Sequence, residues 1–136
     1  MTSSEIKIVE AFLAAINRHD ISKISELMTE DHTFVDPAGR TESGRENIVA
    51  GWKGYFGMFP DYKIEVESIF ADKTLVAVFG SASGTYNGKR GLVPENRIAM
   101  PAAWQALVKN AKIRRWQVYA DWTQGCKIMA EDQGAV

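Results

Sequence analysis

The apolar residues of this 136-residue chain change their spacing at Pro60. Before Pro60 they recur at intervals of three and four residues, which places them along one side of a helix. After Pro60 they alternate with polar residues, as in strands that bury one face. Helices gathered in the first part of a chain and strands in the second predict an α+β fold, with the helices on one face of a mostly antiparallel sheet.

Three helices are predicted ahead of that proline. Thr2 and Glu5 have capping-box spacing at the start of the first helix, and Asp20 can cap the second. A further capping-box pair, Ser43 and Glu46, predicts the start of the third. The apolar positions of the three helices, in chain order, are Ile6, Val9, Phe12, Leu13 and Ile16, then Ile21, Ile24, Leu27 and Met28, then Ile48, Val49, Trp52, Tyr55, Phe56 and Phe59.

One strand is predicted before the third helix and four after it. The early strand, at 30–36, leads into Asp36-Pro37-Ala38-Gly39, whose residue types suit a type I turn. Asn87-Gly88 is a strong hairpin signal, and residues 89–97 are expected to form a loop. The residues from 124 to 136 are expected to be a loose tail. The four later strands are predicted at 62–70, 74–86, 102–108 and 113–121.

Length and composition narrow the function classes. The chain suits a single domain over 1–136, with a core at about 5–123. A net charge of -1 gives no general attraction to nucleic acid or to an acidic membrane, so neither partner is expected. A single cysteine, Cys126, and an N-terminus without a basic and then apolar pattern predict a cytoplasmic protein. No metal site is expected, because no ligand spacing such as HxxxH or CxxC occurs.

Three stretches, in this order and spacing, resemble SnoaL-like polyketide cyclases of the nuclear transport factor two-like superfamily. They lie at 14–20 (AAINRHD), at 34–46 (FVDPAG followed by SGRE) and at 116–121 (WQVYAD). The resemblance implies a cone-shaped roll, in which a strongly bent sheet packs against three N-terminal helices around an apolar pocket. It also implies a homodimer formed through the sheet and a site without a cofactor. Ketosteroid isomerases, limonene epoxide hydrolases, scytalone dehydratases and non-catalytic proteins share this fold, so the fold does not determine the function.

Asp36 is the first candidate for chemistry. The resemblance implies that its Asp-Pro-x-Gly element corresponds to the one carrying the general base of ketosteroid isomerases, a role that needs a pKa raised by dry surroundings. The alternative is a turn aspartate that binds its own backbone. His32 shares a strand face with Asp36 and either shuttles protons or is a partly exposed residue at the strand start. Phe12 and Ala103 replace the isomerase oxyanion-hole residues, so that reaction is not expected.

Asp121 is the second candidate. The resemblance implies that it matches the acid/base aspartate on the last strand of SnoaL-like cyclases, where a carboxyl relays a proton during an aldol-type ring closure. Strand alternation places Asp121 on one face with Tyr119, Gln117 and Arg115. Arg115 could instead hold Asp121 in a structural ion pair and lower its pKa.

Aromatic side chains predict a pocket for a flat or polycyclic molecule, because four tryptophans are many for so small a domain. The alternatives are a plain core and, for the strand aromatics, a dimer interface. Gln105 is either a contact for a ligand carbonyl or a solvent-facing residue. The predicted lining is Phe12, Phe34, Trp52, Tyr55, Phe56, Phe59, Trp104, Gln105 and Tyr119.

These features together predict a small enzyme without a cofactor, of the cyclase, isomerase, dehydratase or hydrolase type. It would act on an apolar, carbonyl-containing polycyclic metabolite, with Asp36, Asp121 and His32 as the acid/base groups. The alternative is a non-catalytic module of the same fold that binds a small molecule or only dimerises.

Overall fold

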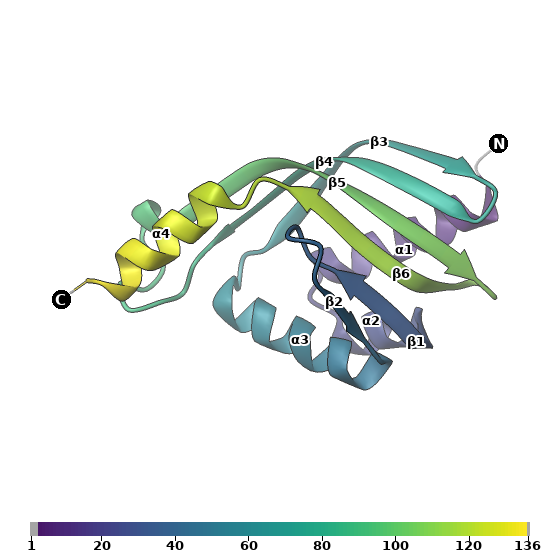
Figure 1. The fold of residues 1–136 in the computed structure, drawn as a ribbon, viewed down its shortest axis with the longest axis horizontal. Coiled ribbons are helices and arrows are strands. Elements are labelled where there is room, and N and C mark those ends of the chain that lie inside the picture. Colours follow the sequence, from purple (N-terminus) through teal and green to yellow (C-terminus); the bar gives the residue numbers. More distant parts are fainter. Residues whose placement is uncertain (1–2, 136) are drawn as a thin grey trace.

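The computed structural model describes residues 3–135, which form four α-helices, a short 3-10 helix and six strands (Figure 1). The elements in chain order are α1 (Ser4–Asn17), α2 (Ile21–Glu26), β1 (Met28–Val35), β2 (Thr41–Ser43), α3 (Arg45–Met58), β3 (Lys63–Asp72), β4 (Leu75–Thr85), η1 (Pro94–Asn96), β5 (Arg97–Lys109), β6 (Lys112–Ala120) and α4 (Thr123–Gln133).

All six strands belong to one sheet, in the order β2-β1-β6-β5-β4-β3. Neighbouring strands are antiparallel except β1 and β6, which run parallel. The sheet curls without closing, and the helices α1, α2 and α3 lie on its inner side (Figure 1). Helix α1 packs on β3, and α3 packs on β1. The predicted α+β class, with a bent sheet against three N-terminal helices, is confirmed.

Side-chain caps start the first two helices. The Ser3 hydroxyl accepts a hydrogen bond from the Ile6 N–H at 3.1 Å, and Asp20 Oδ1 accepts one from the Lys23 N–H at 3.0 Å. The prediction for Asp20 is therefore confirmed. The predicted cap Thr2 lies outside the described residues.

The third helix begins differently from the prediction. Ser43 is the last residue of β2, where its hydroxyl meets the Thr33 hydroxyl at 3.1 Å. Gly44 is the N-cap of α3, with a φ of 97° that glycine adopts without steric cost. The capping box from Ser43 to Glu46 is thus wrong, because pairing with β1 takes Ser43 into a strand. The helix ends ahead of Pro60, as predicted.

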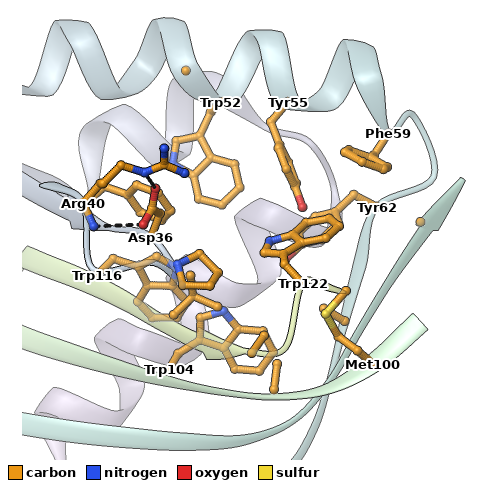
Figure 2. A pocket seen from close by; sticks show the side chains of 18 of the residues that line it. Asp36, Arg40, Trp52, Tyr55, Phe59, Tyr62, Met100, Trp104, Trp116 and Trp122 are labelled. Atoms are coloured by element: carbon orange, nitrogen blue, oxygen red, sulfur yellow. Dashed lines mark hydrogen bonds and ion pairs between the residues drawn. The ribbon is translucent and has the colours of Figure 1, made fainter. Parts of the chain in front are cut away.

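The turn after β1 has the predicted form. The Gly39 N–H donates to the Asp36 carbonyl at 2.9 Å, and the Asp36 N–H donates to the Arg40 carbonyl at 2.9 Å. Gly39 has a φ of 84°, which explains the glycine at this place. The turn brings the side chains of Asp36 and Arg40 beside Trp52 of α3 (Figure 2).

Two predictions about the second half are wrong. Asn87-Gly88 does not join β4 and β5 as a two-residue hairpin; the ladder ends at the pair Thr85 and Arg97, and residues 86–96 form the connection. The expected loose tail is instead helix α4, in which Ile128 and Asp132 are buried. Asp132 accepts hydrogen bonds from backbone N–H groups of the 86–96 connection. Contacts between segments far apart in the sequence therefore order both regions.

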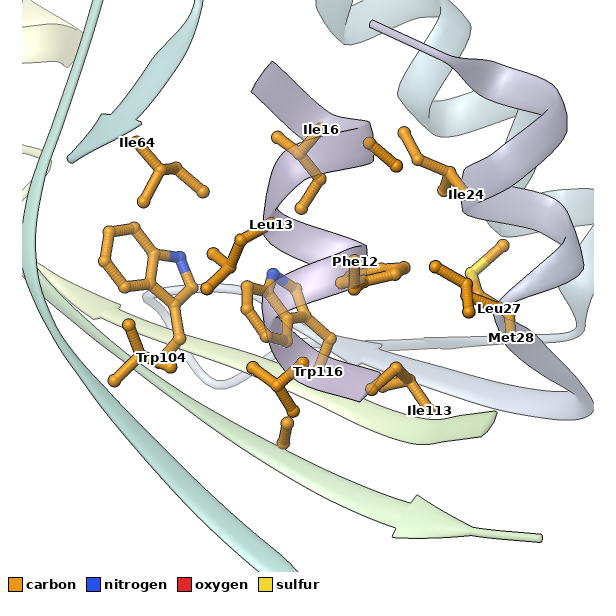
Figure 3. Close-up of a cluster of buried hydrophobic side chains, with 14 of the residues drawn as sticks. Phe12, Leu13, Ile16, Ile24, Leu27, Met28, Ile64, Trp104, Ile113 and Trp116 are labelled. Atoms are coloured by element: carbon orange, nitrogen blue, oxygen red, sulfur yellow. The ribbon is translucent and has the colours of Figure 1, made fainter. Parts of the chain in front are cut away.

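The main core lies between α1 and the inner face of β5 and β6 (Figure 3). Phe12 meets Trp116 edge-on, with ring centroids 5.0 Å apart, and Trp104 stacks near Trp116 at 6.3 Å. All three side chains are at most 2% exposed, so each contributes roughly 1.5–3 kcal/mol or more through burial. This packing fixes the inner wall of the sheet.

Within residues 3–135, no helix is long and apolar enough to span a membrane.

Candidate ligand-binding cavity

A cavity of about 870 Å³ lies between the curled sheet, α3 and the turn after β1 (Figure 2). This volume is in the range of small-molecule sites, about 300–1,000 Å³. Most of the wall is apolar, and all four tryptophans, Trp52, Trp104, Trp116 and Trp122, contribute to it. The polar rim consists of Asp36, Arg40, Thr41 and Glu42.

Helical and strand periodicity explain the wall. Trp52 and Tyr55 of α3 and its C-cap residue Phe59 are three or four residues apart, so they share the face that meets the cavity. On the strands, small side chains stand at inward positions and leave the space open. They are Ala82 and Gly84 of β4, Ala102 of β5 and Ala120 of β6. Ala102 and Ala120 are direct partners across the β5–β6 ladder.

One end of the cavity is an aromatic cluster. Tyr55 and Tyr62 meet edge-on with ring centroids 4.9 Å apart, and Phe59 lies 5.0 Å from Tyr55. Trp122, at the start of α4, closes this end. The distance between the ring centroids of Trp122 and Phe59 is 6.1 Å. Burial raises the pKa of both tyrosines well above the ordinary value of 10.0. Their hydroxyls therefore stay protonated even where an ordinary phenol ionises, near pH 10.

Asp36 stands at the rim, with its side chain 24% exposed. Oδ1 accepts hydrogen bonds from the N–H groups of Ala38 and Arg40, both at 2.9 Å, and Oδ2 accepts one from Arg40 Nε at 3.0 Å (Figure 2). Partial burial by itself raises the pKa of Asp36, but the hydrogen bonds and the Arg40 charge outweigh it and lower this pKa below its usual range. Asp36 is thus an ionised turn residue that also faces the cavity.

Asp121 lies outside the cavity wall. The inward residues of β6 are Trp116, Val118 and Ala120, so Asp121 has the opposite parity. Its Oδ1 accepts a hydrogen bond from the Thr123 N–H at 2.9 Å, and hydrogen bonds from Thr123 lower its pKa. Its role in the structure is to support the start of α4.

Arg115 does not pair with Asp121. Its Nη2 donates to Gln105 Oε1, 2.6 Å away. Gln105 and Tyr119 face away from the cavity, on the outer side of the sheet, and Tyr119 is half exposed. Two of the predicted lining residues are therefore on the opposite face of the sheet from the cavity.

His32 is fully buried behind the cavity wall, so the expectation of a partly exposed residue is wrong. Its Nδ1 lies 2.7 Å from the Ile113 carbonyl oxygen, and its ring is 6.3 Å from that of Phe12. Burial lowers the pKa of His32, which favours the neutral imidazole. The Nδ1 contact with a carbonyl oxygen then makes Nδ1 the protonated nitrogen.

Five of the nine predicted lining residues reach the cavity, and Phe12, Phe56, Gln105 and Tyr119 do not. Phe12 is core, and Phe56 stacks on His19 with centroids 4.0 Å apart. Tyr62, Trp116 and Trp122 complete the aromatic part of the observed wall. Strand alternation would have identified Trp116 on β6, and it would also have placed Tyr62 on the inward face with Ile64 in the strand predicted at 62–70. The predicted lining residues that reach the cavity are Phe34, Trp52, Tyr55, Phe59 and Trp104.

The described part of the chain, 3–135, contains no group of three His, Cys, Asp or Glu side chains placed to hold a metal ion. The cavity itself presents aromatic rings, hydroxyl and indole donors, and a carboxylate at the rim. Such a lining can bind a flat apolar molecule and exchange a proton with it at one end.

Comparison with known proteins agrees with this geometry. Residues 9–116 match the model of the SnoaL-like domain. The chain belongs to the SnoaL-like family. No curated protein sequence matches this SnoaL-like chain.

Several solved structures share the fold of this SnoaL-like protein. A proposed SnoaL-like polyketide cyclase from Shewanella putrefaciens is 17% identical, with a TM-score of 0.80 over 96% of this chain and 88% of that one. An epoxide hydrolase from M. tuberculosis, of the limonene epoxide hydrolase type, is 17% identical, with a TM-score of 0.78 over 97% and 93%. A protein of ketosteroid isomerase-like fold from Catenulispora acidiphila is 22% identical, with a TM-score of 0.76 over 93% and 92%. These similarities establish the fold alone.

Proposed function

We propose that this SnoaL-like protein binds a flat, largely apolar, carbonyl-containing polycyclic molecule and acts on it by proton transfer through Asp36. The observation that carries the proposal is the cavity of about 870 Å³, walled by four tryptophans, with the half-buried Asp36 at its rim. Stacked aromatic walls favour flat ring systems. Structural neighbours that include a proposed polyketide cyclase and an epoxide hydrolase are consistent with cofactor-free acid/base chemistry.

The lowered pKa of Asp36 limits the chemistry that it can perform. The carboxylate is ionised at neutral pH and can accept a proton, but it is a weak base because its charge is already stabilised by Arg40. It therefore suits a carbon acid whose C–H is activated by both a carbonyl and an aromatic ring. The Arg40 guanidinium, 81% exposed, can turn away from Asp36 when a ligand enters.

Hydrogen–deuterium exchange of 2-tetralone tests the proposal, because the C–H group of this fused bicyclic ketone lies between a ring and a carbonyl. We expect the protein to accelerate the exchange, followed by NMR in deuterated buffer. Asp36→Asn should lower the protein-catalysed rate by about 10²–10⁴-fold while ligand binding remains. Asp121→Asn is the matched control and should exchange at the wild-type rate, because Asp121 lies outside the cavity. Wild-type exchange in Asp36→Asn would refute the role of Asp36.

A second candidate function is ligand binding without turnover. Both oxygens of Asp36 already accept hydrogen bonds, from Ala38 and Arg40, and this favours a purely structural carboxylate. The same experiment separates the two functions. Quenching of tryptophan fluorescence by 2-tetralone without acceleration of its exchange would support the binding module.

A further inference from the structure

The end of the cavity away from Asp36 holds two phenol hydroxyls. Tyr55 projects from α3 and Tyr62 from the segment before β3. The angle between their ring planes is 83°. Figure 2 shows the Tyr55 hydroxyl directed into the cavity beside Tyr62, with Trp52 between this end and Asp36. Both tyrosines belong to the cavity wall.

These hydroxyls lie in apolar surroundings. Phe59, Met100 and Trp122 line the same end of the cavity. Burial raises the pKa of both phenols, and a hydrogen bond between the two hydroxyls raises the pKa of Tyr55 further while it partly offsets the effect of burial at Tyr62. Tyr55 is thus the donor and Tyr62 the acceptor of that bond, and the Tyr62 hydroxyl keeps its own proton to donate. A donor withdrawn from water favours a ligand that brings an acceptor, because the lost hydrogen bonds to water are then replaced.

We propose that Tyr55 and Tyr62 form a donor site that binds a carbonyl oxygen of the ligand and so determines its orientation. The inference rests on the proposed function, since it requires an apolar ligand in the cavity. With one carbonyl held at the tyrosine end, a flat ring system lies along Trp52 and brings a second carbonyl, with the C–H group next to it, to Asp36 at the rim (Figure 2). The tyrosines are specificity-determining residues, and Asp36 is the group that exchanges the proton.

The test uses two probes of the same shape, 9-fluorenone and fluorene, which differ by one carbonyl group. Binding to the full chain is measured by quenching of tryptophan fluorescence. We expect the wild type to bind fluorenone more tightly than fluorene, by several-fold to about tenfold, as for a hydrogen bond to a neutral acceptor. Tyr55→Phe and Tyr62→Phe should each reduce this preference, and the double variant should bind both probes equally.

Tyr86→Phe is the matched control. Tyr86 packs on Phe59 with ring centroids 5.8 Å apart but does not belong to the cavity wall, so loss of its hydroxyl should leave the preference unchanged. The infrared carbonyl stretch of bound fluorenone gives a second readout. We expect it at a lower frequency in the wild type than in cyclohexane, because hydrogen bonding weakens the C=O bond. This measurement needs no variant and therefore holds even if a substitution prevents folding.

The outcomes separate the two proposals. Equal wild-type affinity for both probes, a preference that survives in the double variant, or a cyclohexane-like carbonyl stretch would overturn the donor site and leave the proposed binding function intact. Failure of the wild type to bind either probe would overturn both. A preference that disappears in Tyr86→Phe would also overturn the assignment to Tyr55 and Tyr62.

Discussion

Among single residues, the phenol hydroxyls of Tyr55 and Tyr62 have pKa values far above those of a tyrosine in water. Burial raises the pKa of both, so neither should ionise in the folded chain as the pH passes the ordinary phenol value of about 10. The unfolded chain does ionise there. Stability is therefore intact below about pH 10 and falls as the pH rises above it, by at most about 1.4 kcal/mol per pH unit for each tyrosine.

Phenolate absorbance checks this expectation. The folded wild type and the folded double variant Tyr55→Phe/Tyr62→Phe should show the same absorbance change near pH 10–11. After unfolding in urea the wild type should show the larger change. A larger change in the folded wild type would mean that one of the two phenols ionises in the native state.

For the two candidate aspartates, the sequence pattern did not show which side chain faces the cavity. Asp36 follows β1 at an inward position and reaches the cavity, whereas Asp121 follows β6 at an outward position and supports α4. The alternation of β6 already grouped Asp121 with Tyr119 and Arg115. Which of the two faces meets the cavity depends on packing against α1, and that was not readable from the strand alone.

Among the elements, β3 and β4 approach closely beside an irregularity in their pairing. Gly80 lies opposite the register shift between Val66 and Ser68, and a Cβ at this position would overlap the Glu65 carbonyl oxygen. We expect Gly80→Ala to lower the free energy of unfolding by about 1–3 kcal/mol, because the backbone of β3 must move. Urea denaturation measures the change.

Gly54→Ala is the control for that substitution. Gly54 lies on the exposed side of α3, and nothing lies within 4 Å of a Cβ built there. Replacing a glycine inside a helix should raise the free energy of unfolding by about 0.5–1 kcal/mol. Equal effects of the two substitutions would contradict the close approach at Gly80.

Helix α4 depends on a buried carboxylate. Asp132 accepts hydrogen bonds from the Lys89 and Arg90 N–H groups at 2.7 and 2.8 Å and from Asn96 Nδ2 at 2.9 Å. Burial by itself raises the pKa of Asp132, but these donors and the Arg90 charge outweigh it and lower the pKa. Its contribution is therefore present above the ordinary value of about 3.9 and is lost as the pH falls through the lowered pKa.

We accordingly expect α4 to detach at acid pH before the rest of the fold opens. Amide hydrogen exchange across Thr123–Gln133 should accelerate below about pH 4, relative to the intrinsic rate. Asp132→Asn should reduce this pH dependence to the part that Asp121 contributes at the start of the helix, whereas Glu131→Gln, at an exposed position of the same helix, should retain it in full. Protection that persists unchanged at acid pH would show that Asp132 does not hold the helix.

For the whole molecule, the outer face of the sheet suggests how copies associate. This face carries a row of cross-strand neighbours, Phe79 on β4, Ala103 on β5 and Tyr119 on β6. The ring centroid of Phe70 lies 6.4 Å from that of Phe79. Phe70, Phe79 and Tyr119 are between 47% and 61% exposed. An apolar row of this kind on a sheet is typical of an interface, and we propose a homodimer formed through it.

Sedimentation equilibrium tests the dimer. The wild type should sediment as a dimer and Phe79→Glu as a monomer, because a charge in the apolar row would have to be buried without a partner. Leu92→Glu is the control, since Leu92 is 59% exposed in the 86–96 connection. A monomeric wild type, or a dimer unaffected by Phe79→Glu, would contradict this interface.

The sequence by itself determined those features that depend on near neighbours along the chain. The period of the apolar residues specified α1, α2, α3 and five of the six strands, but not β2 or α4, and Asp36-Pro37-Ala38-Gly39 specified its turn. The helical spacing of Trp52, Tyr55 and Phe59 placed three aromatic rings on the face that meets the cavity. Together with the order of three family-like stretches, these local patterns were sufficient for the α+β class and the SnoaL-like family.

Only the tertiary structure decided features that depend on distant segments. Helix α4 forms where Asp132 meets the 86–96 connection, and the wall gains Tyr62 and Trp122 because the curled sheet brings both beside α3. Asp121 and Tyr119 are outside the cavity because packing against α1 sets the inward face of β6. The physical reason is the same in each case: a period identifies the two faces of an element, but long-range contacts choose which face is buried.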